Sequence, residues 1–270
     1  MRRFRCAALA AVAVVGFASV ACAADMPMKA APMVAPVAAY NWTGFYVGGN
    51  VGYGWGTNTG NGYTSTGGPP GFGIPAFFAA GGNVLPGVTP TGIIGGVQIG
   101  YDWQVSPIWV LGVVTDLQAS GMKASGTGAA SIGAFGGITE SNSAQINWFG
   151  TVRGKVGYAA NNVLVYGTGG FAYGQVSANT AFNDPTAGGG PLAWAGSSSV
   201  TRVGWTLGGG VEYALSSNWT IGAEYLYVDL GTISVTETQL NGAATGVTFT
   251  SNTKFNESIA RASINYKFGP

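Results

Sequence analysis

Charged residues, histidine and cysteine are all scarce in this sequence. Only 8% of the 270 residues are charged, whereas a soluble globular domain carries about 25%. Histidine is absent, which excludes Ser-His hydrolase arrangements and most zinc sites. The two cysteines are Cys6 and Cys22, and both lie in a segment that we expect to be removed. Disulfides and thiol nucleophiles are therefore not expected in the mature chain.

Long apolar runs are also missing beyond the first 25 residues, because Gly, Asn, Thr or a charged residue interrupts each of them. A membrane-spanning helix needs about 20 consecutive apolar residues. Yet 47% of the chain is hydrophobic and its mean hydropathy is +0.27. A hydrophobic chain without a spanning helix fits a membrane β-barrel, since a closed barrel satisfies every backbone polar group within the lipid.

The N-terminus predicts export. Three arginines occur in the first five residues, an apolar segment covers Cys6–Val20, and small residues fill Ala21–Ala24. This pattern predicts a cleaved signal peptide over residues 1–24. Ser19 stands where a lipoprotein signal has a large aliphatic residue, which disfavours lipidation. Without the three arginines, 8 basic residues remain against 10 acidic ones, a balance that does not indicate nucleic-acid binding.

Residues 25–40 are rich in Pro and Ala and lack periodicity, so we expect a periplasmic linker. From residue 41 to residue 270, apolar and polar residues alternate in segments separated by turn signals. Eight strands are predicted, at Thr43–Gly56, Thr91–Gln104, Trp109–Ser120, Ala144–Ala160, Val163–Ala178, a hairpin pair within Val203–Gly231, and Thr253–Phe268.

The predicted connections alternate in length. Three are short: Val105–Ile108, Asn161–Asn162 and Leu215–Asn218. The others are long and rich in Gly, Ser, Thr and Asn: Thr57–Pro90, Gly121–Ser143, Asn179–Val200 and Thr232–Asn252. This alternation predicts an all-β fold, an eight-stranded antiparallel up-and-down transmembrane β-barrel with short periplasmic turns and four long extracellular loops.

Two local signals refine this picture. Asn161–Asn162 suits a two-residue hairpin, since Asn tolerates a positive φ. The triplet Asn-Trp-Thr precedes the first strand and begins the seventh, and it predicts that Trp42 and Trp219 lie at one interfacial level in an aromatic girdle.

A soluble barrel would also have one apolar face on each strand. Its charges, however, would cover the outside, and its apolar faces would meet in the centre. Here the charges are few, lie in mid-strand and stand opposite glycines, while Trp, Tyr, Phe and Val form the other face. Eight such faces are too bulky for one narrow lumen, so we expect them to face lipid.

The inward face is then left with four acidic and four basic residues. Paired charges satisfy one another, whereas an unpaired buried charge is costly. The favoured interpretation is an ion-pair network that fills the lumen, and the alternative is a narrow ion path. The network consists of Asp102, Asp116, Glu212, Glu224, Arg153, Lys155, Arg202 and Arg261.

The hairpin formed by strands six and seven fixes a register. If Ala214 pairs with Thr220, Gly210 lies opposite Glu224, and Glu212 also faces a glycine. The preferred ion pair joins Glu224 to Arg261. Carboxylate pairs can perform acid–base chemistry, but these two face a packed lumen, so an enzyme is not expected.

Five segments resemble the small outer-membrane β-barrel family of alphaproteobacteria, which includes surface antigens and some hemin-binding proteins and is related in architecture to OmpA and OmpX. They are YNWTGFYVGGNVGYGWG, WFGTVRGKVGYA, VGWTLGGGVEYAL, WTIGAEYLYVDLG and RASINYKF. The resemblance implies the outer membrane as location. It also implies envelope integrity and surface interaction as roles, and lipid, lipopolysaccharide, periplasmic chaperones and the barrel-assembly machinery as partners. Such barrels end on an aromatic residue read during insertion, here Phe268, which Gly269 and Pro270 follow.

Three functions remain open at this point. The first is a structural protein with a closed lumen, the second a surface-binding protein or adhesin acting through its loops, and the third a small porin-like channel. No cofactor is expected. Without histidine or a mature cysteine, axial ligation of haem would fall to Tyr63 or Met122. The sequence does not specify a ligand for the loops. The loop aromatics are Phe72, Phe77, Phe78, Phe135, Phe182 and Trp194.

Overall fold

The computed structural model describes residues 40–56, 62–68, 87–131, 137–185, 190–242 and 245–269. The predicted signal peptide and all of the predicted linker except its last residue therefore lie outside the described residues, as do Phe72, Phe77, Phe78 and Phe135. In the described ranges, no helix is long and apolar enough to cross a membrane.

Ten strands form one sheet, and in the barrel they follow the alternation of outward apolar and inward small or polar residues along the sequence. Their bounds are β1 Gly44–Gly56, β2 Gly62–Thr66, β3 Thr91–Gln104, β4 Trp109–Ser120, β5 Lys123–Ser131, β6 Gly137–Ala160, β7 Val163–Asp184, β8 Leu192–Ala214, β9 Trp219–Asn241 and β10 Thr248–Phe268.

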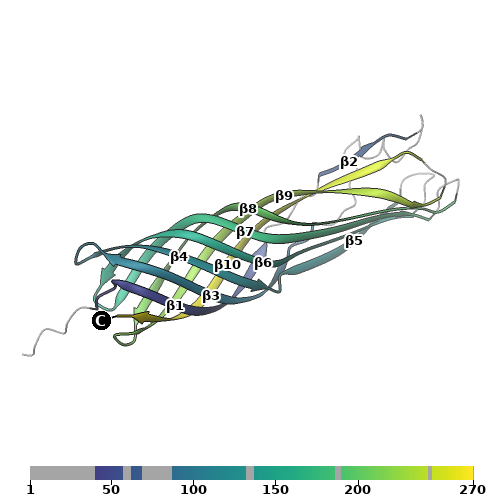
Figure 1. Cartoon of the computed structure of the whole chain (residues 1–270). Helices are drawn as coiled ribbons and strands as arrows, with labels where there is room; N and C mark the ends of the chain where they lie inside the picture. Colours follow the sequence, from purple (N-terminus) through teal and green to yellow (C-terminus); the bar gives the residue numbers. More distant parts are fainter. Residues whose placement is uncertain are drawn as a thin grey trace, which may run out of the picture. The chain divides into compact units, whose positions relative to one another are not determined.

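Eight of these strands close a ring in the order β1-β3-β4-β6-β7-β8-β9-β10, and β1 pairs with both β3 and β10 (Figure 1). Every pairing is antiparallel, and if β2 and β5 are set aside, neighbours in the ring are consecutive in the chain except for the closing pair of β1 and β10. The closing pair runs from Phe45 opposite Phe268 to Gly56 opposite Glu257. The predicted eight-stranded up-and-down barrel is confirmed.

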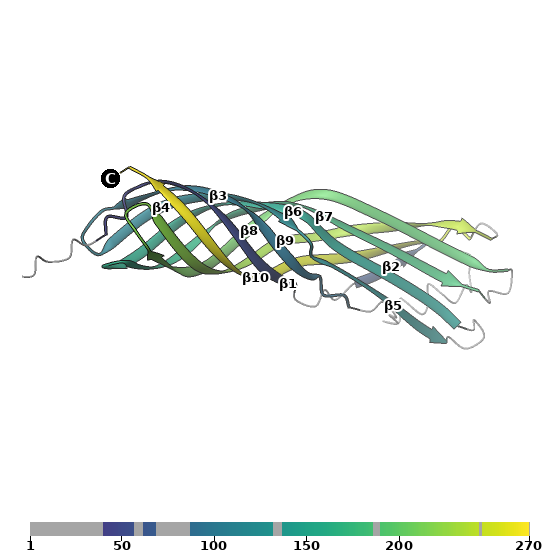
Figure 2. The ribbon, with the colours of Figure 1, turned by 90° about the horizontal axis from the view of Figure 1, so that it is seen from below.

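The prediction of four long loops is wrong in part, because much of three of them is strand. β5 and the beginning of β6 lie within Gly121–Ser143, and the ends of β7 to β10 take up most of Asn179–Val200 and Thr232–Asn252. Ser, Thr, Asn and Gly in these stretches imitate loop composition. Their alternation with inward apolar residues such as Ile138 and Val235 nevertheless supports long hairpins, which extend the sheet well past the barrel (Figure 2).

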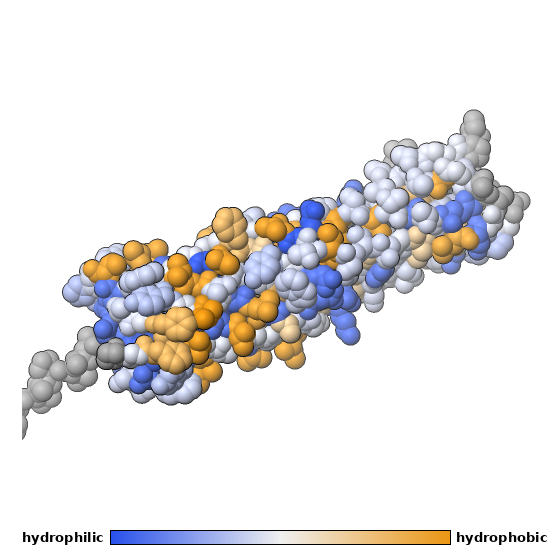
Figure 3. Space-filling view, in the orientation of Figure 1, coloured by the Kyte–Doolittle hydropathy of each residue, from blue (hydrophilic) through white to orange (hydrophobic). Residues whose placement is uncertain are grey.

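The outside of the barrel carries an apolar belt bounded by aromatic residues, as expected of a surface that faces lipid. Val203 is 73% exposed and Ile93 and Phe171 are 69% exposed. Hydrophobic residues gather toward the end where the C-terminus lies, while the extension is mostly pale or blue (Figure 3). The periplasmic rim includes Trp103, Trp109, Tyr158, Trp219 and Tyr266, and the opposite rim, called the outer rim below, includes Trp55, Trp148, Tyr173, Trp205 and Tyr227.

The predicted girdle position of Trp42 is wrong. Trp219 is 44% exposed on the rim, but Trp42 is only 2% exposed and packs inside the barrel. The reason is the side-chain period of two. Trp42 stands three residues before the outward-facing Phe45, and so it takes the opposite face, whereas Trp219 stands two residues before the outward-facing Ile221.

The turn between β6 and β7 occupies Asn161 and Asn162, and Asn161 has a φ of 54°, as the sequence predicts. A β-branched residue held in this left-handed region of φ destabilises the folded state by about 1–2 kcal/mol. We therefore expect Asn161→Val to lower the free energy of unfolding by about that amount, measured by urea denaturation of the barrel in lipid vesicles. Asn161→Gly is the control and should leave stability nearly unchanged, and an equal loss in both variants would contradict this account.

Candidate functional site

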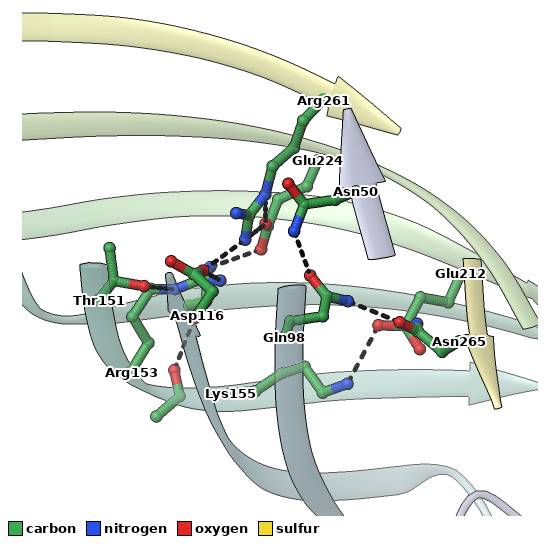
Figure 4. Close-up of polar contacts among 12 residues, drawn as sticks. Asn50, Gln98, Asp116, Thr151, Arg153, Lys155, Glu212, Glu224, Arg261 and Asn265 are labelled. Atoms are coloured by element: carbon green, nitrogen blue, oxygen red, sulfur yellow. Dashed lines mark hydrogen bonds and ion pairs between the residues drawn. The ribbon is translucent and has the colours of Figure 1, made fainter. Parts of the chain in front are cut away.

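The centre of the lumen holds two arginines between two carboxylates, all contributed by different strands (Figure 4). Arg153 on β6 places Nη2 2.9 Å from Asp116 Oδ2 and Nη1 2.6 Å from Glu224 Oε1. Arg261 on β10 places Nη2 2.8 Å from Asp116 Oδ2 and 2.6 Å from Glu224 Oε2. Each acid thus contacts both guanidinium groups, which links β4, β6, β9 and β10 across the barrel.

A second ion cluster lies nearer the periplasmic end. Lys155 Nζ is 2.7 Å from Asp102 Oδ2 and 3.2 Å from Glu212 Oε1. The rings of Tyr46 and Tyr166 flank the ammonium group at 5.2 and 5.0 Å from their centroids, within the range of a cation–π interaction. The lysine therefore has acidic and aromatic partners on several strands.

A row of uncharged side chains also follows the lumen wall over four neighbouring strands (Figure 4). Asn50 donates to Gln98 at 3.3 Å, Gln98 donates to Asn265 at 2.7 Å, and Asn265 donates to Thr220 at 3.3 Å. These residues belong to β1, β3, β10 and β9. Hydrogen-bonded amide side chains therefore fill part of the lumen that the ion pairs do not fill.

Inward glycines provide the room that the charged side chains need. A Cβ on Gly112 would lie 2.1 Å from Asp102 Oδ1, and one on Gly52 would lie 2.6 Å from Arg261 Cβ. The register of β8 and β9 matches the prediction, with Ala214 opposite Thr220 and Gly210 opposite Glu224. Glu224 lies opposite Arg261 on β10, and the two form the ion pair described above.

Arg202 differs from its predicted place in the network. Its Nη2 donates to the carbonyl of Thr232 at 2.7 Å, where the register between β8 and β9 shifts, beyond the level of the ion pairs. Alternation fixes the face on which a side chain lies but not its height along the barrel, which explains the difference. Lys267, which the prediction left out of the network, is 4% exposed in the floor, where it donates to the carbonyl of Asn41 and lies 4.2 Å from the centroid of the Tyr40 ring.

Apolar clusters lie on both sides of these polar layers. The periplasmic floor packs Trp42, Val110, Ala159, Leu164 and Ala214. Burial in this floor raises the pKa of Tyr40, which precedes β1, to about 12, and the nearby carboxylates add to the shift. The larger cluster lies toward the outer end and includes Ile94, Met122, Leu226, Val228, Phe255 and Ile259. The sequence prediction missed this outer cluster, although the inward parity of Leu226 and Val228 on β9 was available to find it.

The surface-ligand hypothesis loses two of its residues. Phe182 and Trp194 are 1% and 0% exposed, and they pack against each other and against Phe249 with ring centroids 5.1 to 5.5 Å apart. Met122 is 1% exposed within the outer apolar cluster, so it presents no free ligand for haem. The side chain of Tyr63 lies outside the described residues. Across the described ranges, no group of three or more His, Cys, Asp or Glu residues is placed to hold a metal ion.

Comparison with known proteins identifies relatives along almost the whole chain. The family model described as "Outer membrane protein beta-barrel domain" matches residues 10–268. A 31 kDa outer-membrane immunogenic protein of Brucella melitensis is 38% identical over 258 residues, which cover 93% of this chain and 95% of the relative. A 25 kDa outer-membrane immunogenic protein of Brucella abortus is 28% identical over 234 residues, covering 86% and 87%. The crystal structure of OprG from Pseudomonas aeruginosa is similar at 13% identity and a TM-score of 0.41, covering 86% of this chain and 99% of that one.

The central ion pairs predict a large effect of a small change. Glu224→Gln keeps the shape of the side chain but leaves two buried arginines with one carboxylate. Breaking a buried pair in this way costs about 3–5 kcal/mol, so the free energy of unfolding in lipid vesicles should fall by that amount. Asp229→Asn removes one charge from a pair with the half-exposed Lys254 at 3.4 Å and keeps the oxygen that accepts from the Gly231 N–H, so it should cost less than about 1 kcal/mol. Equal effects of the two substitutions would argue against the buried network.

Proposed function

Because the chain belongs to the outer membrane protein beta-barrel domain family, a family of the cell outer membrane, we propose that it is a structural protein of that membrane. In this proposal its lumen is plugged and its outer extension serves surface interaction. The observation that carries it is the continuous packing of the lumen: apolar floor, lysine cluster, amide row, arginine cluster and outer apolar cluster follow one another.

The closed lumen disfavours the channel alternative. The interior of an eight-stranded barrel is just wide enough for side chains to fill. Arg153, Lys155 and Arg261 are each at most 5% exposed, so a hydrated ion would have to displace paired charges on its way. The same packing supports a role without catalysis, since each acid of the two ion clusters contacts a cation.

A barrel with a filled lumen spans the membrane without opening a pore through it, which supports the proposed role in envelope integrity. The named relatives are immunogenic outer-membrane proteins, which supports an exposed extension here as well. The proposed partners are outer-membrane lipid and lipopolysaccharide, together with periplasmic chaperones and the barrel-assembly machinery. Phe268, the last residue of β10 and the partner of Phe45, is the proposed insertion signal.

A plugged lumen predicts the absence of large single-channel currents. Purified protein in planar bilayers should give no large, steady conductance steps at neutral pH, because buried, paired side chains fill the lumen. A general porin reconstituted in the same bilayers is the positive control. Large, steady steps from the purified protein would defeat the plugged-lumen proposal.

The envelope role predicts a leakage phenotype. Deleting the gene should increase the entry of a large antibiotic that an intact outer membrane excludes, and the wild-type gene should restore the barrier. Glu224→Gln should restore it less well than Asp229→Asn, because less folded barrel accumulates. Unchanged leakage in the deletion strain would count against a contribution to envelope integrity.

A further inference from the structure

A groove crosses the outward face of the extension, on five neighbouring strands from β5 to β9. Its volume is about 650 Å³. Cross-strand pairing from β5 to β8 arranges its walls as two rows of outward side chains. On β9, Thr238 lies opposite Ala195 and so continues the first row, and the backbone of Thr236 lies beside Gly196, next to the second row. The first row is Thr127, Ser141, Ala181, Ala195 and Thr238, and the second is Ser125, Ser143, Asn179, Ser197 and Thr236.

The groove is open because these side chains are short. Residues two apart on one strand lie about 6.6 Å from each other on the same face, and Ser, Thr and Ala do not bridge that distance. Between the two rows, the floor consists of Gly126, Asn142, Thr180 and Gly196, which lie opposite one another in register. Asn142 and Thr180 are 2% and 3% exposed, so their side chains point inward and leave backbone at the floor.

The lining has one chemical character. Seven of the ten wall residues carry a hydroxyl and one carries an amide, and none of the described residues that line the groove is charged or aromatic. Such a surface does not attract phosphate or sulfate groups and offers no apolar face for an acyl chain. Hydroxyls both donate and accept hydrogen bonds, which suits a ligand that is itself neutral and covered with hydroxyls.

The geometry fits an extended chain. Adjacent strands lie about 4.8 Å apart, so the second row presents one polar side chain per strand at about that interval along the groove, whereas the first row does so only at Thr127, Ser141 and Thr238. An extended chain of pyranose rings repeats at a similar interval. The groove therefore matches several consecutive sugar residues rather than one compact ligand.

The position of the groove selects the source of the sugar. It lies beyond the outer aromatic rim, on the side of the long connections, which in such barrels is extracellular. The nearest saccharide there is the one attached to the outer leaflet. We propose that this groove binds a neutral saccharide segment of the surrounding lipopolysaccharide. The inference deepens the surface interaction of the proposed function and needs only the outward orientation from it.

The test uses purified barrel in detergent micelles and the polysaccharide released by mild acid from the lipopolysaccharide of the same strain. Isothermal titration calorimetry should detect binding to the wild type. Ala195→Trp fills the groove and should weaken binding by about tenfold or more. Val203→Trp, on the same strand and also facing outward but at the membrane rim, should bind as the wild type does. An absence of binding to the wild type, or equal binding by all three proteins, would overturn the proposal.

Heat-modifiable migration in gels reports whether each variant folds. If Ala195→Trp does not fold, the double variant Asn179→Ala and Thr127→Ala removes polar groups without adding bulk and should weaken binding severalfold; unchanged binding would overturn the proposal. Light scattering tests whether a second copy of the chain occupies the groove instead. A dimer that Ala195→Trp dissociates, with no saccharide bound, would replace the saccharide by a second copy of the chain. A conducting lumen would refute the plugged barrel but would leave these results untouched.

Discussion

The structure depends on one constraint: no backbone N–H or C=O group in the lipid can be left without a partner. An open sheet would expose two edges to hydrocarbon at a cost of several kcal/mol for each unpaired group. Pairing of β1 with both β3 and β10 removes both edges. Once the ring closes, each strand has one face toward lipid and one toward a narrow lumen, and every other feature of the molecule follows from filling that lumen and covering that surface.

Filling the lumen couples strands that are distant in sequence. Asp116 and Arg261 are 145 positions apart and share a hydrogen bond of 2.8 Å. The glycines beside them are as important as the charges, because a Cβ at Gly112 or Gly52 would occupy space now held by a neighbouring polar side chain. The high glycine content and the low charge content of the sequence are therefore two aspects of one packing solution.

The sequence predicts the features that alternation controls. The bounds of β3 and β4 agree with the predicted Thr91–Gln104 and Trp109–Ser120, because strong outward aromatic and aliphatic residues contrast with the inward ones. The face on which each lumen charge lies follows from the same contrast. The height of a side chain along the barrel does not follow from it. The sequence therefore predicts Arg202 in a network whose other members lie well below it.

The sequence prediction is wrong for two further features, the long hairpins and the position of Trp42. The long hairpins of β6 to β10 contain Ser, Thr, Asn and Gly on their outward face, so the contrast that marks a strand in lipid disappears once the strand enters water. The triplet that Trp42 shares with Trp219 predicts the same rim position for both, whereas counting from Phe45 gives Trp42 the inward face that it occupies. Parity along the strand is a stronger guide than a shared triplet, because the side-chain period is fixed by the pleat.

The closing seam has a consequence for how the protein is made. Phe45 and Phe268 stand opposite each other although almost the whole described chain separates them. Contacts of such high sequence separation form slowly, since the entropy of closing the intervening chain is lost first. The first strand must therefore remain unpaired on one side until the last strand has been exported. The cost of this seam therefore falls on the folding rate, whereas the finished barrel has no exposed strand edge there.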